Sequence, residues 1–193
     1  LTFHKKKSIK ETFKFIFNRK IFFSKSATSD YKVFFINQTI MLLVSPHLLT
    51  QMTIATAFYF FFFDLQFLEM GMFSSTPQYV IISLFTLSHF LVDDFSKYIV
   101  HRWMHKWPFL WALHKVHHSA TNLTPMTVFR THPLEGLVFT LRSAFAQGLT
   151  ISTFVYFFGS GVDLYTILGA NLFVFFFNVF GSNLRHSHIG IRY

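Results

Sequence analysis

The sequence contains no cysteine. Without thiols, the chain has no disulfide, no thiolate metal site and no cysteine nucleophile. A metal bound to this chain must therefore rely on imidazole nitrogens and carboxylate oxygens. The chain has 11 histidines, and their distribution becomes the feature to follow.

Charged residues are also scarce. They make up 13% of the 193 residues, against about a quarter in soluble domains. Apolar residues make up 52% of the chain, and 30 residues are phenylalanine. This composition argues against an ordinary soluble domain and favours a protein embedded in a lipid bilayer.

The few charges are segregated along the chain. Nine of the 17 lysines and arginines lie within residues 1–32, and none lies between Lys32 and Lys97. Basic residues that flank long apolar runs mark the cytoplasmic side of membrane proteins, where anionic lipids attract them. We therefore assign the net charge of +9 to a membrane partner and expect no nucleic acid partner.

The same pattern divides the chain into a basic amphipathic N-terminal segment, residues 1–32, and a membrane-embedded domain, residues 33–193. Within residues 4–25, apolar side chains follow an i, i+4, i+7, i+8 spacing. They are Ile9, Phe13, Ile16 and Phe17. This spacing predicts a helix that lies in the membrane interface, and a disordered basic tail is the alternative.

Apolar runs that approach the roughly 20 residues of a membrane-crossing helix recur along the domain. They cover residues 33–50, 52–68, 77–92, 135–157 and 162–182. We predict an all-α integral membrane protein with about four transmembrane helices. Residues 33–68 would form one crossing plus a re-entrant or surface-lying portion, with the break at Pro46 and His47. Basic residues from Lys97 to Arg130 place a histidine-rich helical cap on the cytoplasmic side of the plasma membrane or endoplasmic reticulum.

Five histidines lie close together in the chain. They are His101, His105, His114, His117 and His118. They form two groups, one with His101 and His105 and one with the other three. On a helix, residues three or four apart share a face, so each group can direct its ring nitrogens into one volume. Pro108 can turn the chain between two helices and bring the two faces together. Imidazoles without a shared ligand would leave polar nitrogens unsatisfied, at about 1–3 kcal/mol each, so the pattern predicts metal ligands.

A third group follows the last apolar run, at His186 and His188. The chain returns there to the side of the membrane that holds the first two groups. His188 faces away from His186 on a helix and joins it only on an extended segment. Histidines from three stretches exceed the four ligands of a structural zinc site, so two metal ions are the simpler account. Ligand type alone leaves zinc, iron, nickel and copper open.

Four motifs in order carry a resemblance to a known family. They read Asp-Phe-Ser-Lys-Tyr-Ile-Val-His-Arg-Trp-Met-His, Trp-Ala-Leu-His-Lys-Val-His-His-Ser, Arg-Thr-His-Pro-Leu-Glu and Asn-Leu-Arg-His-Ser-His. From Asp94 to its C-terminus, the chain resembles the fatty acid hydroxylase/sterol desaturase superfamily. The resemblance implies an oxidoreductase with two non-heme irons, dioxygen as oxidant, electrons from an NAD(P)H-linked reductase or cytochrome, and a sterol or fatty-acyl lipid as substrate.

The resemblance also implies which residues are the metal ligands and catalytic residues. They are His101, His105, His114, His117, His118 and His186. Clustering adds His188 as a further metal ligand. The superfamily's final His-x-x-His-His motif is missing, so we expect this chain to be truncated at its C-terminus and inactive by itself.

Ligating imidazoles usually donate their second nitrogen to a carboxylate or a carbonyl group. Asp94 lies about two helical turns before His101 and shares its face, whereas Asp93 is offset. We expect Asp94 to orient a ligand. Two further sites, His132 paired with Glu135 and Asn183 by itself, are expected to do the same.

Other polar and aromatic residues receive structural interpretations. Arg130 either neutralises a carboxylate or meets a lipid headgroup, and the sequence leaves both open. We predict that His89, inside an apolar run, is a buried hydrogen-bonded residue rather than a ligand. Trp103, Trp107 and Trp111 recur every four residues, which is typical of an aromatic belt at a membrane interface.

The predicted reaction oxidises an unactivated lipid C–H bond with dioxygen and leaves a hydroxyl group or a double bond. Two alternatives remain open. An inactive or truncated metal-binding membrane protein would hold its metal weakly. A metal transporter would place its histidines along a pathway within the spans.

Overall fold

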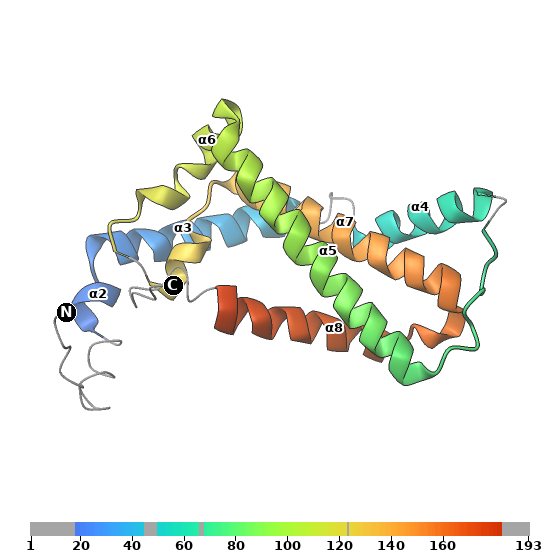
Figure 1. The fold of residues 1–193 in the computed structure, drawn as a ribbon. Coiled ribbons are helices and arrows are strands. Elements are labelled where there is room, and N and C mark those ends of the chain that lie inside the picture. The colour runs from blue at the N-terminus through green and yellow to red at the C-terminus, as the bar shows by residue number, and fades with distance from the viewer. Residues whose placement is uncertain (1–17, 45–49, 66–67, 123, 183–193) are drawn as a thin grey trace, which may run out of the picture.

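The computed structural model describes residues 18–44, 50–65, 68–122 and 124–182. All regular secondary structure in these ranges is helical, as Figure 1 shows. The all-α prediction is therefore confirmed for the described part of the chain.

Two helices open the described chain, α2 (Arg19–Phe22) and α3 (Lys25–Val44). Phe23 and Ser24 separate them, and the hydroxyl of Ser24 accepts a hydrogen bond from the backbone N–H of Ala27 at 3.1 Å. A serine at this position satisfies a helix N-terminus and so favours a new helix start. The predicted interfacial helix over 4–25 lies mostly outside the described residues, and the chain does not continue it as one helix through Ser24.

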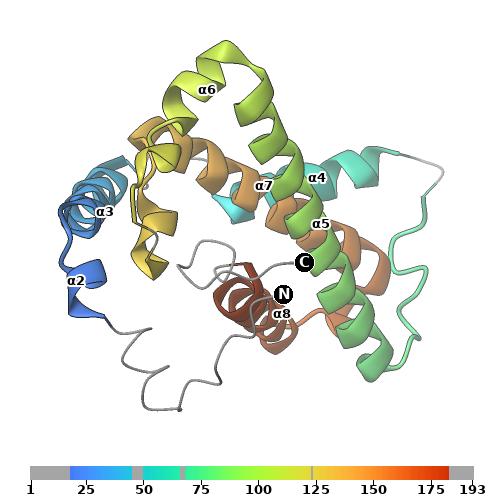
Figure 2. The ribbon, with the colours of Figure 1, turned by 60° about the vertical axis from the view of Figure 1, so that its left-hand side comes forward.

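Helix α4 (Gln51–Asp64) packs along α7 (Pro133–Phe158), and the two lie side by side in Figures 1 and 2. Gly148 of α7 permits the close approach, because a Cβ added there would lie 2.8 Å from a side-chain methyl carbon of Ile54. The predicted break between the first two apolar runs, at Pro46 and His47, lies outside the described residues.

Helix α5 (Gln78–Lys106) is the long diagonal element of Figure 1 and packs against both α7 and α8 (Leu164–Phe177). A small apolar core forms where the three helices meet. It contains Ile81, Phe85, Phe154 and Ala170. Asp163 caps α8 by accepting hydrogen bonds from the backbone and hydroxyl of Thr166, and these bonds lower the pKa of Asp163.

Three short helices follow α5, and the first of them packs against α5. They are α6 (Pro108–His114), η2 (His117–Ser119) and η3 (Pro125–Phe129). Pro108 begins α6 directly after the extended residue Trp107, so the predicted turn at Pro108 is confirmed. In Figure 2 this segment folds back from the end of α5 toward α3.

Two more short elements flank α8. A 3₁₀ turn, η4 (Gly159–Gly161), joins α7 to α8, and a π-helical turn, η5 (Asn178–Ser182), follows α8. Gly159 ends α7 with a φ of 60°, a backbone conformation that glycine adopts without a side-chain clash.

Among the described residues, α5 is the one helix long and apolar enough to cross a membrane by length and composition. The four-crossing prediction is therefore not confirmed. Helices α4 and α8 have 14 residues each, or about 21 Å, which falls short of a hydrocarbon core of about 30 Å. Helix α3 begins in the charged region before Lys32, so only its second half is apolar.

Candidate metal centre

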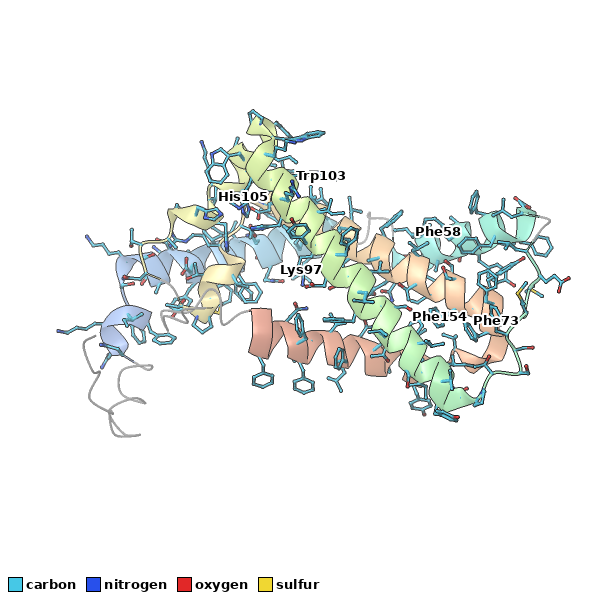
Figure 3. The ribbon with its side chains drawn as sticks, viewed as in Figure 1. Phe58, Phe73, Lys97, Trp103, His105 and Phe154 are labelled. Carbon is cyan, nitrogen blue, oxygen red and sulfur yellow. The ribbon has the colours of Figure 1, made fainter. Side chains whose placement is uncertain are left out.

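The C-terminal end of α5 supplies the first two imidazoles of the site. His101 and His105 are one helical turn apart, and their Nε2 atoms lie 3.2 Å from each other. Figure 3 labels His105 near this end of α5, close to Trp103. The i, i+4 spacing of these two histidines on a regular helix explains why both rings enter the same volume.

The next histidines come from α6 and η2. The Nε2 atoms of His114 and His118 lie 3.1 Å apart. The ring of His114 lies 4.7 Å from that of His101 and 4.8 Å from that of His105, measured between centroids. His117 stands beside them, with its ring centroid 5.5 Å from His114 and 5.4 Å from His118. The structure therefore gathers all five local histidines into one cluster.

These distances fit metal ligation. Imidazole nitrogens about 2.0–2.1 Å from one ion lie about 2.8–3.4 Å from each other at octahedral to tetrahedral angles. The His101/His105 and His114/His118 nitrogen pairs, at 3.2 and 3.1 Å, fall within that range. One ring nitrogen from each of His101, His105 and His114 can be chosen so that all three lie within 4.8 Å of one another. The donor atoms of this cluster are imidazole nitrogens, one of the two ligand types that a chain without cysteine offers.

A buried carboxylate contacts one histidine of the cluster. Glu135, in the first turn of α7, places its Oε1 atom 2.7 Å from Nδ1 of His114. Both side chains are 2% exposed. When His114 donates its Nδ1–H to this carboxylate, its Nε2 lone pair points toward the other imidazoles, the arrangement in which outer carboxylates support metal-bound histidines.

His132 has a different place from the one expected. Its Nδ1 accepts the backbone N–H of Leu134 at 3.2 Å and caps α7. The sequence paired His132 with Glu135, whereas the described partner of Glu135 is His114. His132 therefore sets the start of the helix that carries Glu135.

The acidic pair on α5 divides between surface and interior. Asp94, which we expected to orient a ligand, is exposed. Asp93 is buried, and its Oδ1 lies 2.8 Å from a guanidinium nitrogen of Arg142 on α7. His89 is also buried, with Nε2 3.2 Å from Oδ1 of Asn171, so its prediction as a hydrogen-bonded interior histidine is confirmed.

One local prediction is wrong. The spacing of His114, His117 and His118 suggested a single helix, but α6 ends at His114 and a separate 3₁₀ turn begins at His117. The hydroxyl of Ser119 donates to the carbonyl of Val116 at 2.7 Å, a bond that belongs to the tight turn rather than to a continuing α-helix.

Trp111 is a contact residue that the sequence interpretation missed. Its ring centroid lies 5.4 Å from His105 and 5.5 Å from His118, so it packs against the cluster. Trp103 and Trp107 stack on each other instead, 6.2 Å apart. The available signal was the position of Trp111 three residues before His114, which places both on one face of α6.

The third predicted histidine group lies outside the described residues. This applies to the predicted ligands His186 and His188 and to Asn183. Their roles stay predictions.

The described part of the chain is thus a helical framework that carries an imidazole cluster with a buried carboxylate beside it, and these two features define its class. Comparison with known protein families identifies the family within this class. Residues 86–192, more than half of the chain, match the family described as fatty acid hydroxylase. The chain belongs to this family, within the fatty acid hydroxylase/sterol desaturase superfamily.

A curated relative agrees with this assignment. Over 70 residues the chain is 39% identical to a Delta(7)-sterol 5(6)-desaturase of Eremothecium gossypii. The matched stretch covers 36% of this chain and 20% of that protein. The chain therefore matches about a fifth of the length of this relative. No solved structure matches the chain.

Proposed function

We propose that this protein is a membrane-bound oxidoreductase that uses two irons and dioxygen to hydroxylate or desaturate a sterol or a fatty-acyl lipid. The observation that carries the proposal is the convergence of five imidazoles around two close Nε2 pairs, with Glu135 behind His114. The family of residues 86–192 and the sterol desaturase relative support the same reaction class.

The metal ligands proposed are the five clustered histidines together with the two that follow α8. They are His101, His105, His114, His117, His118, His186 and His188. Two bound irons would supply the reduction of dioxygen and the oxidation of an unactivated C–H bond. When His114 donates its Nδ1–H to the carboxylate of Glu135, the Nε2 atom of His114 is left to bind the metal.

Exposed apolar surface supports a lipid substrate and a membrane environment. Large apolar side chains remain exposed along α8 and along α5, which carries the first two histidines at its C-terminal end. They include Leu87, Leu91, Phe95, Leu172, Phe173 and Phe176. Surfaces of this kind are typical of contact with lipid or with another apolar partner. An acyl chain or sterol moving along α5 would reach the histidines at its C-terminal end.

The basic residues around the cluster support a cytoplasmic site. Arg102, Lys106 and Lys115 are exposed next to the histidines in the chain. Basic segments beside apolar helices remain on the cytoplasmic side of plasma and endoplasmic reticulum membranes. An electron donor linked to NAD(P)H, either a reductase or a cytochrome, would reach the site from that side.

The test measures bound iron and the oxidised lipid product in the same experiment. Full-length protein purified from membranes is expected to contain iron, and cells that express it under ¹⁸O₂ are expected to form a lipid with one labelled oxygen atom or with two fewer hydrogen atoms. Replacing both His105 and His118 with Ala should remove the metal and the product. Wild-type protein without bound iron, or a double variant that keeps full iron and product, would contradict the proposal.

One observation favours a second candidate, a non-catalytic protein with a vestigial site. The Nε2 distances of 3.2 and 3.1 Å also satisfy direct hydrogen bonds between imidazoles when one ring of each pair donates. A vestigial site predicts that a strong chelator leaves the thermal midpoint unchanged. The oxygenase predicts that the chelator lowers it, because metal bound only to the folded state stabilises that state.

A further inference from the structure

We propose that helix α3 helps to position the metal centre, because Asp30 on α3 and Arg130 together hold the turn that carries His117 and His118. This inference rests on the proposed function. It assigns a positioning role to residues of α3, which precede the family match at residues 86–192.

Arg130 is the centre of the arrangement. It is 6% exposed, and its Nε donates to Oδ1 of Asp30, which is fully buried on α3. One terminal nitrogen, Nη2, donates to the carbonyl of Ser26 at 2.6 Å and contacts the Ser26 hydroxyl at 3.2 Å. The other, Nη1, lies 3.3 Å from Oγ of Ser119. A single guanidinium therefore joins α3 to the residue that follows His118.

The loop around Arg130 is fixed to α3 at further points. The hydroxyl of Thr127 donates to Oδ2 of Asp30 at 2.9 Å. The backbone N–H of Thr121 donates to the Ser26 hydroxyl at 3.2 Å. Both carboxylate oxygens of Asp30 are thus used, and both ends of the segment from Ser119 to Arg130 contact α3.

The position of Ser119 explains how this anchor reaches the histidines. Its hydroxyl donates to the carbonyl of Val116 at 2.7 Å and can accept from Arg130 Nη1. Val116 directly precedes His117, and Ser119 directly follows His118. The hydroxyl therefore closes the turn around these two histidines, and Arg130 holds that hydroxyl in place.

Arginine is suited to this role and lysine is not. The guanidinium is a planar fork with five donors, so one side chain can serve the carboxylate, the Ser26 carbonyl and the Ser119 hydroxyl at once. A lysine would keep the positive charge beside Asp30 but would lose the fixed fork. Arg130→Lys therefore separates the positioning role from charge neutralisation.

The chain contains a matched control. Arg142 on α7 is also mostly buried, pairs with the buried Asp93 at 2.8 Å and contacts the Asp93 carbonyl and the Ser96 hydroxyl, each at 2.8 Å. This second arginine has the same three kinds of partner as Arg130. Its hydroxyl partner Ser96 lies five residues before His101, whereas Ser119 adjoins His118. Arg142→Lys and Ser96→Ala therefore repeat the two substitutions away from the histidine turn.

The experiment measures Co²⁺ binding to full-length protein in detergent, by chelator competition and by the visible absorption of the bound ion. We expect Arg130→Lys and Ser119→Ala each to weaken Co²⁺ binding about tenfold and to change the absorption spectrum, as loss of an outer hydrogen bond does at metal sites. Arg142→Lys and Ser96→Ala should lower the thermal midpoint at most, with wild-type affinity and spectrum.

The outcomes separate the two proposals. Wild-type protein that binds neither Co²⁺ nor iron refutes the proposed function and this inference with it. Wild-type protein that binds metal while Arg130→Lys and Ser119→Ala keep its affinity and spectrum refutes the inference alone, as does an equal loss in Arg142→Lys. Should Arg130→Lys fail to fold, Ser119→Ala decides, because it leaves the buried ion pair intact.

Discussion

Glu135 illustrates how single residues define the candidate site. Oε1 of Glu135 contacts His114, and Oε2 is buried without a hydrogen-bond partner in the described part of the chain. Burying a carboxylate is unfavourable unless a charged or hydrogen-bonding group compensates it. A cation bound by the imidazoles would compensate the charge of Glu135 through His114.

The charge of Glu135 is therefore expected to matter more than its shape. Glu135→Gln keeps an oxygen that can accept from His114 but removes the negative charge. We expect it to weaken metal binding about 10- to 100-fold, the usual effect of altering an outer carboxylate. Chelator competition measures the change, and Asp94→Asn serves as an exposed control on α5. Equal metal affinity in Glu135→Gln and wild type would exclude this role.

At the scale of elements, helix packing depends on one small residue. Gly148 of α7 faces Ile54 and Ala55 of α4, and a Cβ there would lie 2.8 Å from Ile54 Cγ2 and 3.0 Å from the Ala55 backbone nitrogen. The backbone atom cannot move aside without a shift of α4. Phe58 and Phe145 continue the contact, with ring centroids 5.3 Å apart.

We expect Gly148→Ala to lower the free energy of unfolding by about 1–3 kcal/mol, because an added methyl group overpacks the contact. Gly169→Ala is the matched control, since a Cβ at Gly169 on α8 meets nothing within 4 Å. That substitution should be neutral, or stabilising by up to about 1 kcal/mol through helix propensity. Denaturant unfolding in detergent compares the two variants. Equal stability of both would show that α4 and α7 do not pack as closely as described.

At the scale of the whole molecule, apolar side chains are divided between a small core and a large exposed surface. The core where α5, α7 and α8 meet contains few large side chains, while many aromatic residues on α4, α5 and α8 remain exposed. Figure 3 labels Phe154, which belongs to this core, and Phe58 on α4. In water such a surface would favour association, whereas in a bilayer it is solvated by lipid.

We expect the protein to remain in the membrane fraction after washes with high salt and alkaline carbonate, and to be released by detergent. The physical reason is the exposed apolar surface together with α5, which is long enough to cross a bilayer. A peripheral membrane protein from the same cells, released by the carbonate wash, is the control. Recovery of this protein with that control would contradict the proposed membrane location.

Features that depend on near neighbours could be predicted from the amino-acid sequence. The i, i+4 spacing of His101 and His105 fixed their convergence, and Pro108 fixed the turn between α5 and α6. The lack of cysteine excluded thiolate ligands, and the spacing of the histidines predicted a site built on imidazoles. Local hydrogen bonding and side-chain geometry on a helix are short-range, so residue spacing is enough to predict them.

Contacts between residues far apart in the chain became visible only in the folded protein. Glu135 is 21 residues from His114, and Asp30 is 100 residues from Arg130, yet each pair is in contact. The sequence left open whether Arg130 meets a carboxylate or a lipid, and it paired Glu135 with His132. Residue spacing does not predict contacts between separate helices, because these contacts depend on how α3, α5, α6 and α7 pack together. The turn that follows the end of α6 at His114 is likewise connected through Ser119 to Arg130, a residue of a later segment.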